Sequence, residues 1–211
     1  MRTLVKSLLF ERVPTLAVAM LCSLLMLSAC SSGPPPKLYL LDSIEADTQG
    51  IELVRTSVIK TLGMSPVELP DYSADTRIAS LGSDGTVYLD DANRWAEEPK
   101  DAITRLFSDR LRAHSEGTVL VEPWPRDYEP VARVEVSFDK LLRQPDGGAH
   151  LTGKILLLSG SGRKLLKAVQ FNISHIGSNT DSRAFFIAVA KGIDDIANIA
   201  VAEIRAFGIK S

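Results

Sequence analysis

An alternation of apolar and polar side chains between residues 132 and 139 constrains the fold most strongly. Because successive side chains of a β-strand point to opposite faces, a period of two predicts a strand with one buried face. Glycine-rich turns at 146–148 and 160–162 separate this segment from two further apolar runs, 151–158 and 165–173. The three segments are therefore predicted to form an antiparallel meander. The apolar positions of the first strand are Ala132, Val134, Val136 and Phe138, and the polar ones are Arg133, Glu135, Ser137 and Asp139.

Shorter strand signals precede the meander and bring the expected total to five to seven strands. A hairpin is predicted where two apolar arms flank the turn at 82–85, which contains two glycines. The other short runs are rich in Val, Ile and Leu and are bounded by Gly or Pro. The expected segments are 37–42, a strand within 51–69, the hairpin arms 77–81 and 86–89, and 119–121.

Two long stretches have helical spacing. The first, 98–114, places Pro99 in its opening turn, where the missing amide hydrogen is tolerated, and it ends before Gly117. The second, 182–207, repeats apolar residues every three or four positions and so presents one apolar stripe. Together with the strands, these helices predict an α/β domain in which helices pack on a mixed, largely antiparallel sheet. The stripe of the second helix consists of Phe186, Val189, Ile193, Ile196, Ala200 and Ile204.

The amino terminus has the pattern of a targeting segment. Three cationic residues within the first twelve precede the uncharged apolar stretch 13–29. A transmembrane helix is the alternative, but a span needs about 20 apolar residues, and Pro14 interrupts the beginning of this run. The segment 27–30, Leu-Ser-Ala-Cys, resembles the bacterial lipoprotein processing box. We therefore expect residues 1–29 to be a lipoprotein signal peptide.

Cys30 is then the lipidated first residue of the mature chain. Cys22 competes, but a bulky Leu precedes it, so we expect Cys22 to leave with the signal peptide. Residues 30–37 are predicted to be the lipidated cysteine and a Pro-rich tether, and 38–211 a single domain. Several acyl chains make membrane attachment effectively permanent. Ser31 follows the cysteine where an Asp would resemble an inner-membrane retention signal, so we expect the periplasmic face of the outer membrane.

The sequence offers no constellation for catalysis, a metal or a cofactor, so we predict a protein that is not an enzyme. His114, His150 and His175 lie on separate elements without ligands at zinc spacing and are expected at the surface or half-buried. Segment 159–164 contains glycines and a Lys but lacks phosphate-loop spacing, which favours a hairpin turn. The acidic pairs at 90–91 and 97–98 are interpreted as surface groups and helix-dipole partners. A net charge of −2 argues against nucleic acid as a partner.

Two tryptophans in expected loops stand out. Trp95 lies in Asn93–Glu97, just before the first helix, and Trp124 lies in Glu122–Pro125, after the short strand at 119–121. Trp and Arg are enriched at binding hot spots. The alternative is that Trp95 staples the helix to the sheet and Trp124 fills the core of a loop. The sequence leaves both interpretations open.

The ordered set of these features resembles the ABC-type transport auxiliary lipoproteins of the PqiC/YmbA type. The set comprises the processing box, the tether with Tyr39–Asp42, the segments Val67–Tyr72 and Asn93–Glu97, the meander and the terminal helix. The resemblance covers essentially the whole mature chain and implies a three-layer α/β/α-like arrangement. After Tyr72 the chain departs from the family, reading Ser-Ala-Asp-Thr-Arg-Ile where Leu-Asp-Arg-Pro-Gln-Ile is typical.

The resemblance also implies a function. Such proteins are accessory subunits of Gram-negative systems in which mammalian-cell-entry (MCE) domain proteins carry lipids between the two membranes, supporting envelope integrity. We accordingly expect a non-catalytic adaptor with an MCE-domain tunnel protein as partner, and self-association stays open. A generic envelope lipoprotein that binds peptidoglycan or another lipoprotein is the alternative, and an anchored hydrolase is a third. A partner-binding patch is expected at Asp71, Tyr72, Arg94 and Trp95.

Overall fold

The computed structural model describes residues 34–41, 61–114 and 117–207. The expected signal peptide, Cys30 and the first part of the tether lie outside the described residues, as do residues 42–60 of the predicted 51–69 segment. In chain order the elements are β1 Lys37–Tyr39, β2 Thr61–Met64, the 3-10 helix η1 Asp71–Ser73, β3 Arg77–Leu81, β4 Val87–Trp95, α3 Pro99–Ala113, β5 Thr118–Val121, β6 Ala132–Arg143, β7 Ala149–Ser159, β8 Leu165–His175 and α4 Ser182–Ala206.

Strand β6 is the centre of the sheet. Its side chains alternate between buried and half-buried from Ala132 to Phe138, as the period of two predicts. One edge of β6 pairs with β7 along its length. The other edge is shared, because β2 pairs parallel near Ala132 and β3 pairs at Arg143. The sheet therefore branches, with one group of short strands at each end of β6.

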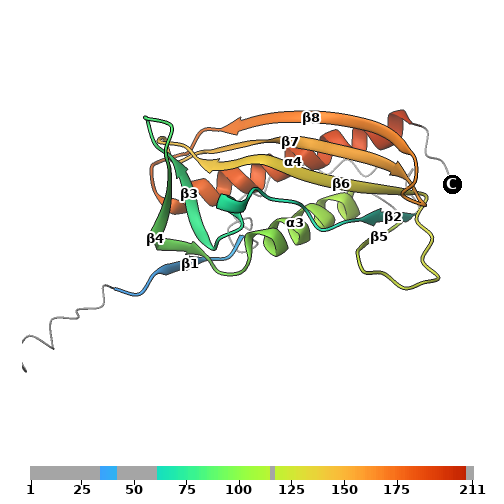
Figure 1. Cartoon of the computed structure of the whole chain (residues 1–211), viewed down its shortest axis with the longest axis horizontal. Helices are drawn as coiled ribbons and strands as arrows, with labels where there is room; N and C mark the ends of the chain where they lie inside the picture. The colour runs from blue at the N-terminus through green and yellow to red at the C-terminus, as the bar shows by residue number, and fades with distance from the viewer. Residues whose placement is uncertain (1–33, 42–60, 115–116, 208–211) are drawn as a thin grey trace, which may run out of the picture. The chain divides into compact units, whose positions relative to one another are not determined.

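The predicted meander is confirmed. β6 with β7, and β7 with β8, form two long antiparallel ladders. Gly147 and Gly162 sit in the two connecting turns with φ near +80° and +73°, a region that glycine enters at low cost. Figure 1 shows the three strands as long neighbouring arrows with α4 behind them.

Short strands complete a mixed sheet of eight strands. β5 pairs parallel with β2 at one end of β6. At the other end, the predicted hairpin forms between β3 and β4, and β1 adds to β4 in parallel. Each of the eight overlaps a segment expected from the sequence, so the expected total of five to seven undercounted those segments.

The two helices bury their apolar stripes in one continuous core. All six predicted stripe residues of α4 are buried. In α3, Pro99 opens the first turn and Ala102, Ile103, Leu106 and Phe107 are buried. The core joins these side chains to the inward face of the sheet.

The α/β class with a mixed sheet is confirmed, but the described residues show two layers rather than three. α3 and α4 pack against each other as well as on the sheet. They therefore lie on the same side of it. The opposite face of β6 carries half-buried polar side chains such as Arg133 and Glu135, and none of the described helices covers it.

Candidate functional site

The segment that contains Asp71 and Tyr72 is fastened to the carboxyl-terminal half of β6. The Tyr72 hydroxyl donates a hydrogen bond to the Asp139 carbonyl at 3.1 Å, and the buried Ser73 hydroxyl donates to the Leu141 carbonyl at 2.8 Å. Burial raises the pKa of Tyr72 above its usual range. Asp71 is exposed. Tyr72 and Ser73 thus hold this turn in place, and Asp71 is left to face solvent.

Arg94 and Trp95 occupy the end of strand β4, so the expectation that they lie in a loop is wrong. The cross-strand register places Arg94 beside Leu38 of β1 and beside Arg77 of β3, and it places Trp95 beside Tyr39. Successive residues of a strand point to opposite faces. Arg94 and Trp95 therefore face opposite sides of the sheet.

Trp95 belongs to the core. Its side chain is 4% exposed, and its ring centroid lies 4.7 Å from that of Phe186 and 6.2 Å from that of Phe185. Tyr39 stacks on Phe186 from the neighbouring strand at 5.1 Å. These geometries are the edge-to-face and stacked arrangements that aromatic pairs prefer. The packing alternative for Trp95 therefore describes its side chain.

Arg94 takes part in an ionic cluster on the outer face of β3 and β4. Arg77 binds both carboxylate oxygens of Asp75, at 3.0 Å from Nε and 2.7 Å from Nη2. Asp91 lies 3.6 Å from Arg77 and 3.5 Å from Arg94. Hydrogen bonds from Arg77 are the main reason that the pKa of Asp75 falls to about 2. Asp75 is therefore ionised at neutral pH, and it pairs with Arg77 in a polar cluster.

The structure brings the two predicted segments together without assembling all four side chains. The Trp95 amide donates to the Thr76 carbonyl at 2.7 Å, which joins the end of β4 to the chain after η1. A depression of about 510 Å³ opens beside this junction, and of the four predicted residues only Arg94 lines it. Its other lining residues are Ala74, Asp75, Thr76, Arg77 and Glu98.

A second surface at the opposite end of β6 is more highly organised than the sequence indicated. The half-buried Trp124 ring packs edge-on against Tyr128 at 5.9 Å, and the Arg133 guanidinium lies over it at 4.9 Å. The backbone of Gly63 lies so close to the ring that a Cβ there would sit 2.7 Å from Trp124 Cη2. Glu122 accepts hydrogen bonds from Ser65 at 3.0 Å and from Arg133 at 3.3 Å. Trp124 is therefore held in one orientation.

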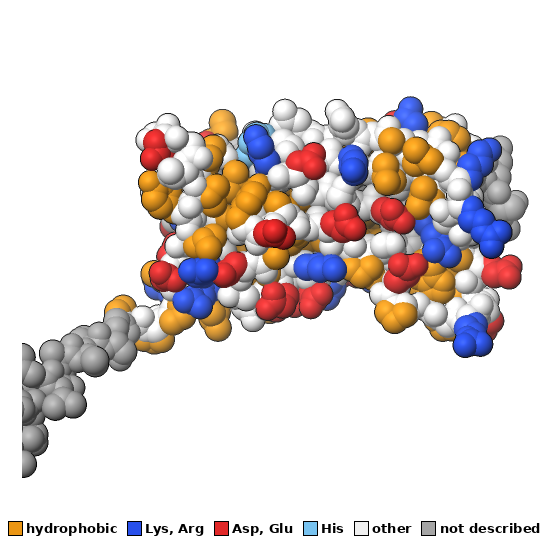
Figure 2. Space-filling model, in the orientation of Figure 1, with side chains coloured by type: hydrophobic (Ala, Val, Ile, Leu, Met, Phe, Trp, Pro, Cys, Tyr) orange, Lys and Arg blue, Asp and Glu red, His pale blue; other side chains and the backbone are white. Residues whose placement is uncertain are grey.

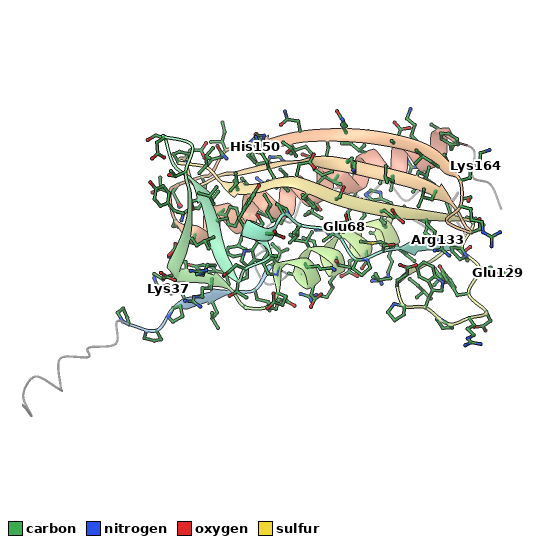
Figure 3. All side chains as sticks on the ribbon, in the orientation of Figure 1. Lys37, Glu68, Glu129, Arg133, His150 and Lys164 are labelled. Atoms are coloured by element: carbon green, nitrogen blue, oxygen red, sulfur yellow. The ribbon has the colours of Figure 1, made fainter. Side chains whose placement is uncertain are left out.

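Two shallow cavities run from Trp124 onto the open face of the sheet. One, of about 440 Å³, is lined by Pro66, Glu122, Pro123 and Trp124. The other, of about 230 Å³, shares Pro66 and continues over β6 and β7. Figure 3 shows Arg133 and Glu129 at this end and Lys37 at the other. The tryptophan could be singled out from the sequence, but its partner Arg133 could not, because it reads there as one polar position of an alternating strand.

Two acidic residues from the pairs at 90–91 and 97–98 make hydrogen bonds within the fold. Glu97 binds Arg105 through both oxygens, at 2.5 and 2.8 Å, and this pairing lowers the pKa of Glu97. Asp90 accepts hydrogen bonds from the backbone and side chain of Asn93. Segment 159–164 forms the predicted turn between β7 and β8. Among the described residues no three His, Cys, Asp or Glu side chains are grouped as metal ligands would be.

The histidines differ in part from expectation. His150 and His175 are half-buried and bind Asn172 at 2.9 Å and Asp195 at 2.8 Å. His114, expected at the surface or half-buried, is only 8% exposed because it caps the carboxyl end of α3 next to α4. None of the three histidines lines the depression beside Arg94 or the two cavities beside Trp124.

Comparison with known families decides the affiliation of the chain. The model of the ABC-type transport auxiliary lipoprotein component family matches residues 39–200, which is more than half of the sequence. The chain belongs to this family. The match begins at Tyr39 in β1 and ends within α4, so it spans both candidate surfaces of this auxiliary lipoprotein component. No helix in the described part of the chain has the length and hydropathy to cross a membrane.

Two solved structures have a similar fold at low sequence identity. A Xanthomonas campestris protein of family DUF330 is 13% identical, with a TM-score of 0.60, over 75% of this chain and 90% of that chain. An uncharacterized protein is 18% identical, with a TM-score of 0.57, over 71% of this chain and 95% of that chain. A PelC dodecamer from Paraburkholderia phytofirmans is 12% identical, with a TM-score of 0.44, over 74% of this chain and 91% of that chain. A search of curated proteins gave no match.

Proposed function

We propose that the protein is an outer-membrane-anchored periplasmic lipoprotein and a non-catalytic accessory subunit of an MCE-domain lipid transport system. The observation that carries this proposal is the family match over residues 39–200, which covers nearly the whole folded part of the chain. An auxiliary component acts through partners. A lipid anchor at Cys30 would hold the domain close to such a partner and raise the effective concentration of a weak contact.

The use of polar groups supports a binding role over catalysis. Bidentate arginine pairs hold Glu97 and Asp75. The pKa of neither carboxylate is raised toward neutrality, since these pairs lower both pKa values. A general base works best with a pKa near the working pH. These two carboxylates are therefore poorly suited to that task.

The partner contact at the four predicted residues is part of this proposal, with different roles for its members. Asp71 is exposed and the Arg94 side chain is 35% exposed, so both can touch a partner. Tyr72 and Trp95 instead hold their segments against β6 and the core. Arg94 lies on the wall of the polar depression, where a guanidinium can receive a carboxylate or carbonyl.

The anchor is tested by Cys30→Ala. Because lipid attachment must precede cleavage at a processing box, the variant is expected to remain a larger, unprocessed form. Electrophoresis of fractionated envelopes measures this, with Cys22→Ala as the control that is processed normally. Normal cleavage and outer-membrane fractionation of Cys30→Ala would show that the anchor lies elsewhere.

The partner contact is tested by comparing Arg94→Ala with Trp95→Ala. We expect Arg94→Ala to keep its melting temperature and to lose capture of the MCE-domain protein. Trp95→Ala is expected to melt at a lower temperature because it empties a core position. Arg163→Ala, an exposed arginine in the turn between β7 and β8, is the matched control. If Arg94→Ala still captures the MCE-domain protein, Arg94 does not belong to the partner contact. If the wild-type protein binds cell-wall fragments and not the MCE-domain protein, the general envelope role is favoured.

A further inference from the structure

Strand β1 carries apolar side chains on both of its faces. On the inner face Tyr39 stacks on Phe186, and Leu41, beyond the end of the strand, is fully buried. On the outer face Leu38 is 63% exposed, and Leu40, which directly follows β1, is 44% exposed. One face is therefore satisfied by the core, and the other presents two leucines to solvent.

Exposed apolar side chains also occur on β4, where Val87 and Tyr88 lie six and five residues before the Asn93 that pairs with β1. The described residues include seven large hydrophobic side chains that are exposed, and four of them lie at or next to the paired strands β1 and β4. Figure 2 shows hydrophobic side chains gathered where the described chain begins. The four are Leu38, Leu40, Val87 and Tyr88.

The position of β1 in the chain indicates what covers it. Leu38 follows Cys30 by eight residues. A fully extended chain spans at most about 3.6 Å per residue, so Leu38 stays within about 29 Å of a lipidated Cys30. Lys37 and Pro36 between them are exposed. A cation followed by apolar side chains suits the boundary between headgroups and acyl chains.

The order of strands keeps this surface available. β1 is an edge strand that pairs with β4, and the ionic cluster of Arg77 and Arg94 lies further in on the same face. A bilayer can therefore meet the edge at Leu38 and Leu40 while a protein partner reaches the depression beside Arg94. The two contacts occupy neighbouring but separate parts of this end of the sheet.

We propose that the outward leucines of β1 rest in the interfacial layer of the phospholipid bilayer that holds the Cys30 lipid. The proposal rests on the proposed lipid anchor. It fixes the orientation of the domain along β6. Arg143 lies near the β3–β4 hairpin, and Arg133 lies ten residues away at the other end, a distance of about 33 Å. The surface around Trp124 then faces away from the membrane.

The test places a fluorescent probe at one exposed leucine at a time. Processing removes Cys22 and acylation blocks Cys30, so an added cysteine is the only reactive thiol of the mature full-length protein. Leu38→Cys carries a polarity-sensitive label. The matched control is Leu165→Cys, since Leu165 is a leucine with 54% exposure that lies at the other end of β6 next to Leu158. Both lipidated proteins are reconstituted into vesicles of phosphatidylethanolamine and phosphatidylglycerol containing spin-labelled lipids.

We expect the label at 38 to shift to shorter emission wavelength and to be quenched several-fold more strongly than the label at 165. Equal quenching, or none at either position, in protein that floats with the vesicles would overturn the proposal and leave the anchor intact. Protection of the label at 38 only after a protein partner is added would assign the leucines to that partner instead. Failure to float with vesicles would overturn the lipid anchor and, with it, this orientation. Melting curves of both variants confirm that the fold is intact.

Discussion

At the scale of single residues, the ionic cluster on β3 and β4 depends on one carboxylate. Asp75 binds the Arg77 guanidinium and also accepts the Arg77 amide at 2.8 Å. Arg77 also forms an ion pair with Asp91, and Asp91 forms a second ion pair with Arg94. Asp75 thus determines where the Arg77 side chain lies and, through it, part of the wall of the depression.

Asp75→Asn is expected to cost about 1 kcal/mol or less, because the pair is one-third exposed and screened by solvent. The folded pKa of about 2 lies below the ordinary value of 3.8. The stabilisation is therefore complete above about pH 5 and is lost progressively as the pH falls through 3.8 and then through 2. Denaturant unfolding of both proteins across this range measures the difference. A difference that stays constant down to pH 2 would contradict the role of the Asp75 charge.

Gly63→Ala tests the orientation of Trp124. The new Cβ would lie 2.7 Å from the Trp124 ring and 3.1 Å from Pro130, so we expect the ring to shift from its present position. We expect a loss of about 1 to 3 kcal/mol, the usual cost of overpacking, and a red shift of tryptophan emission. Trp95 is buried elsewhere and supplies a constant background. An unchanged emission spectrum would mean that the strand yields and the ring stays.

The two tryptophans show what residue-level reasoning could and could not predict. Both were singled out from the sequence by type and by proximity to expected loops. Their fates depend on contacts across the fold, since Trp95 meets Phe186 from α4 and Trp124 meets Arg133 from β6. No local pattern encodes such pairings, so the sequence could not separate the core residue from the surface residue.

At the scale of elements, the periodicity of apolar residues predicted the long helices and strands that have one buried face. The meander and both helices agree with the structure because each has a long pattern with one buried face. β4 extends to Trp95, beyond the expected 86–89, since its register with β1 and β3 is set by partners distant in sequence. The side of the sheet on which each helix lies is likewise decided by packing between α3 and α4.

Ile193→Ala tests the packing of α4 on the sheet. Ile193 is fully buried in the core, so the variant is expected to lose about 2 to 5 kcal/mol of unfolding free energy. Ile176→Ala is the control, because Ile176 is 83% exposed and should change stability by less than about 0.5 kcal/mol. Chemical denaturation measures both. A loss under about 1 kcal/mol for Ile193→Ala would mean that the stripe is not a close-packed contact.

Arg110→Ala tests the ionic link between α3 and α4. Arg110 pairs with Asp194, whose side chain is 7% exposed. Removing one partner of a buried pair costs about 3 to 5 kcal/mol. Burial raises the pKa of Asp194 against the opposing effect of Arg110. Without Arg110, Asp194 can relieve its buried charge by taking up a proton at low pH but not at neutral pH. The loss should therefore be larger at pH 7 than at pH 4.

Arg112→Ala is the matched control for this link. Arg112 lies on the same helix and pairs with Asp109, but both side chains are about half-exposed. Such surface pairs contribute at most about 1 kcal/mol. Equal losses for Arg110→Ala and Arg112→Ala in thermal unfolding would show that burial of the Arg110 pair adds nothing.

At the scale of the whole molecule, the described fold separates two surfaces along one strand. The end of β6 near Arg143 carries β1, the hairpin and the polar depression beside Arg94. The end near Arg133 carries Trp124 and its cavities. One continuous core connects them. A single rigid domain can therefore hold one end at a membrane and present the other to the periplasm.

Removing the anchor should abolish function while leaving the fold and the contact itself intact. We expect a mature chain exported with a signal peptide that carries no lipid attachment site to keep its melting temperature, because none of the described residues 34–38 belongs to the core. Its solution affinity for the proposed MCE-domain partner should equal that of the lipidated protein in detergent. Envelope integrity should nonetheless fail, since an anchored contact gains about 10²- to 10⁴-fold in avidity. Full complementation of a deletion strain by this secreted form, at matched expression, would show that the anchor contributes nothing to the function.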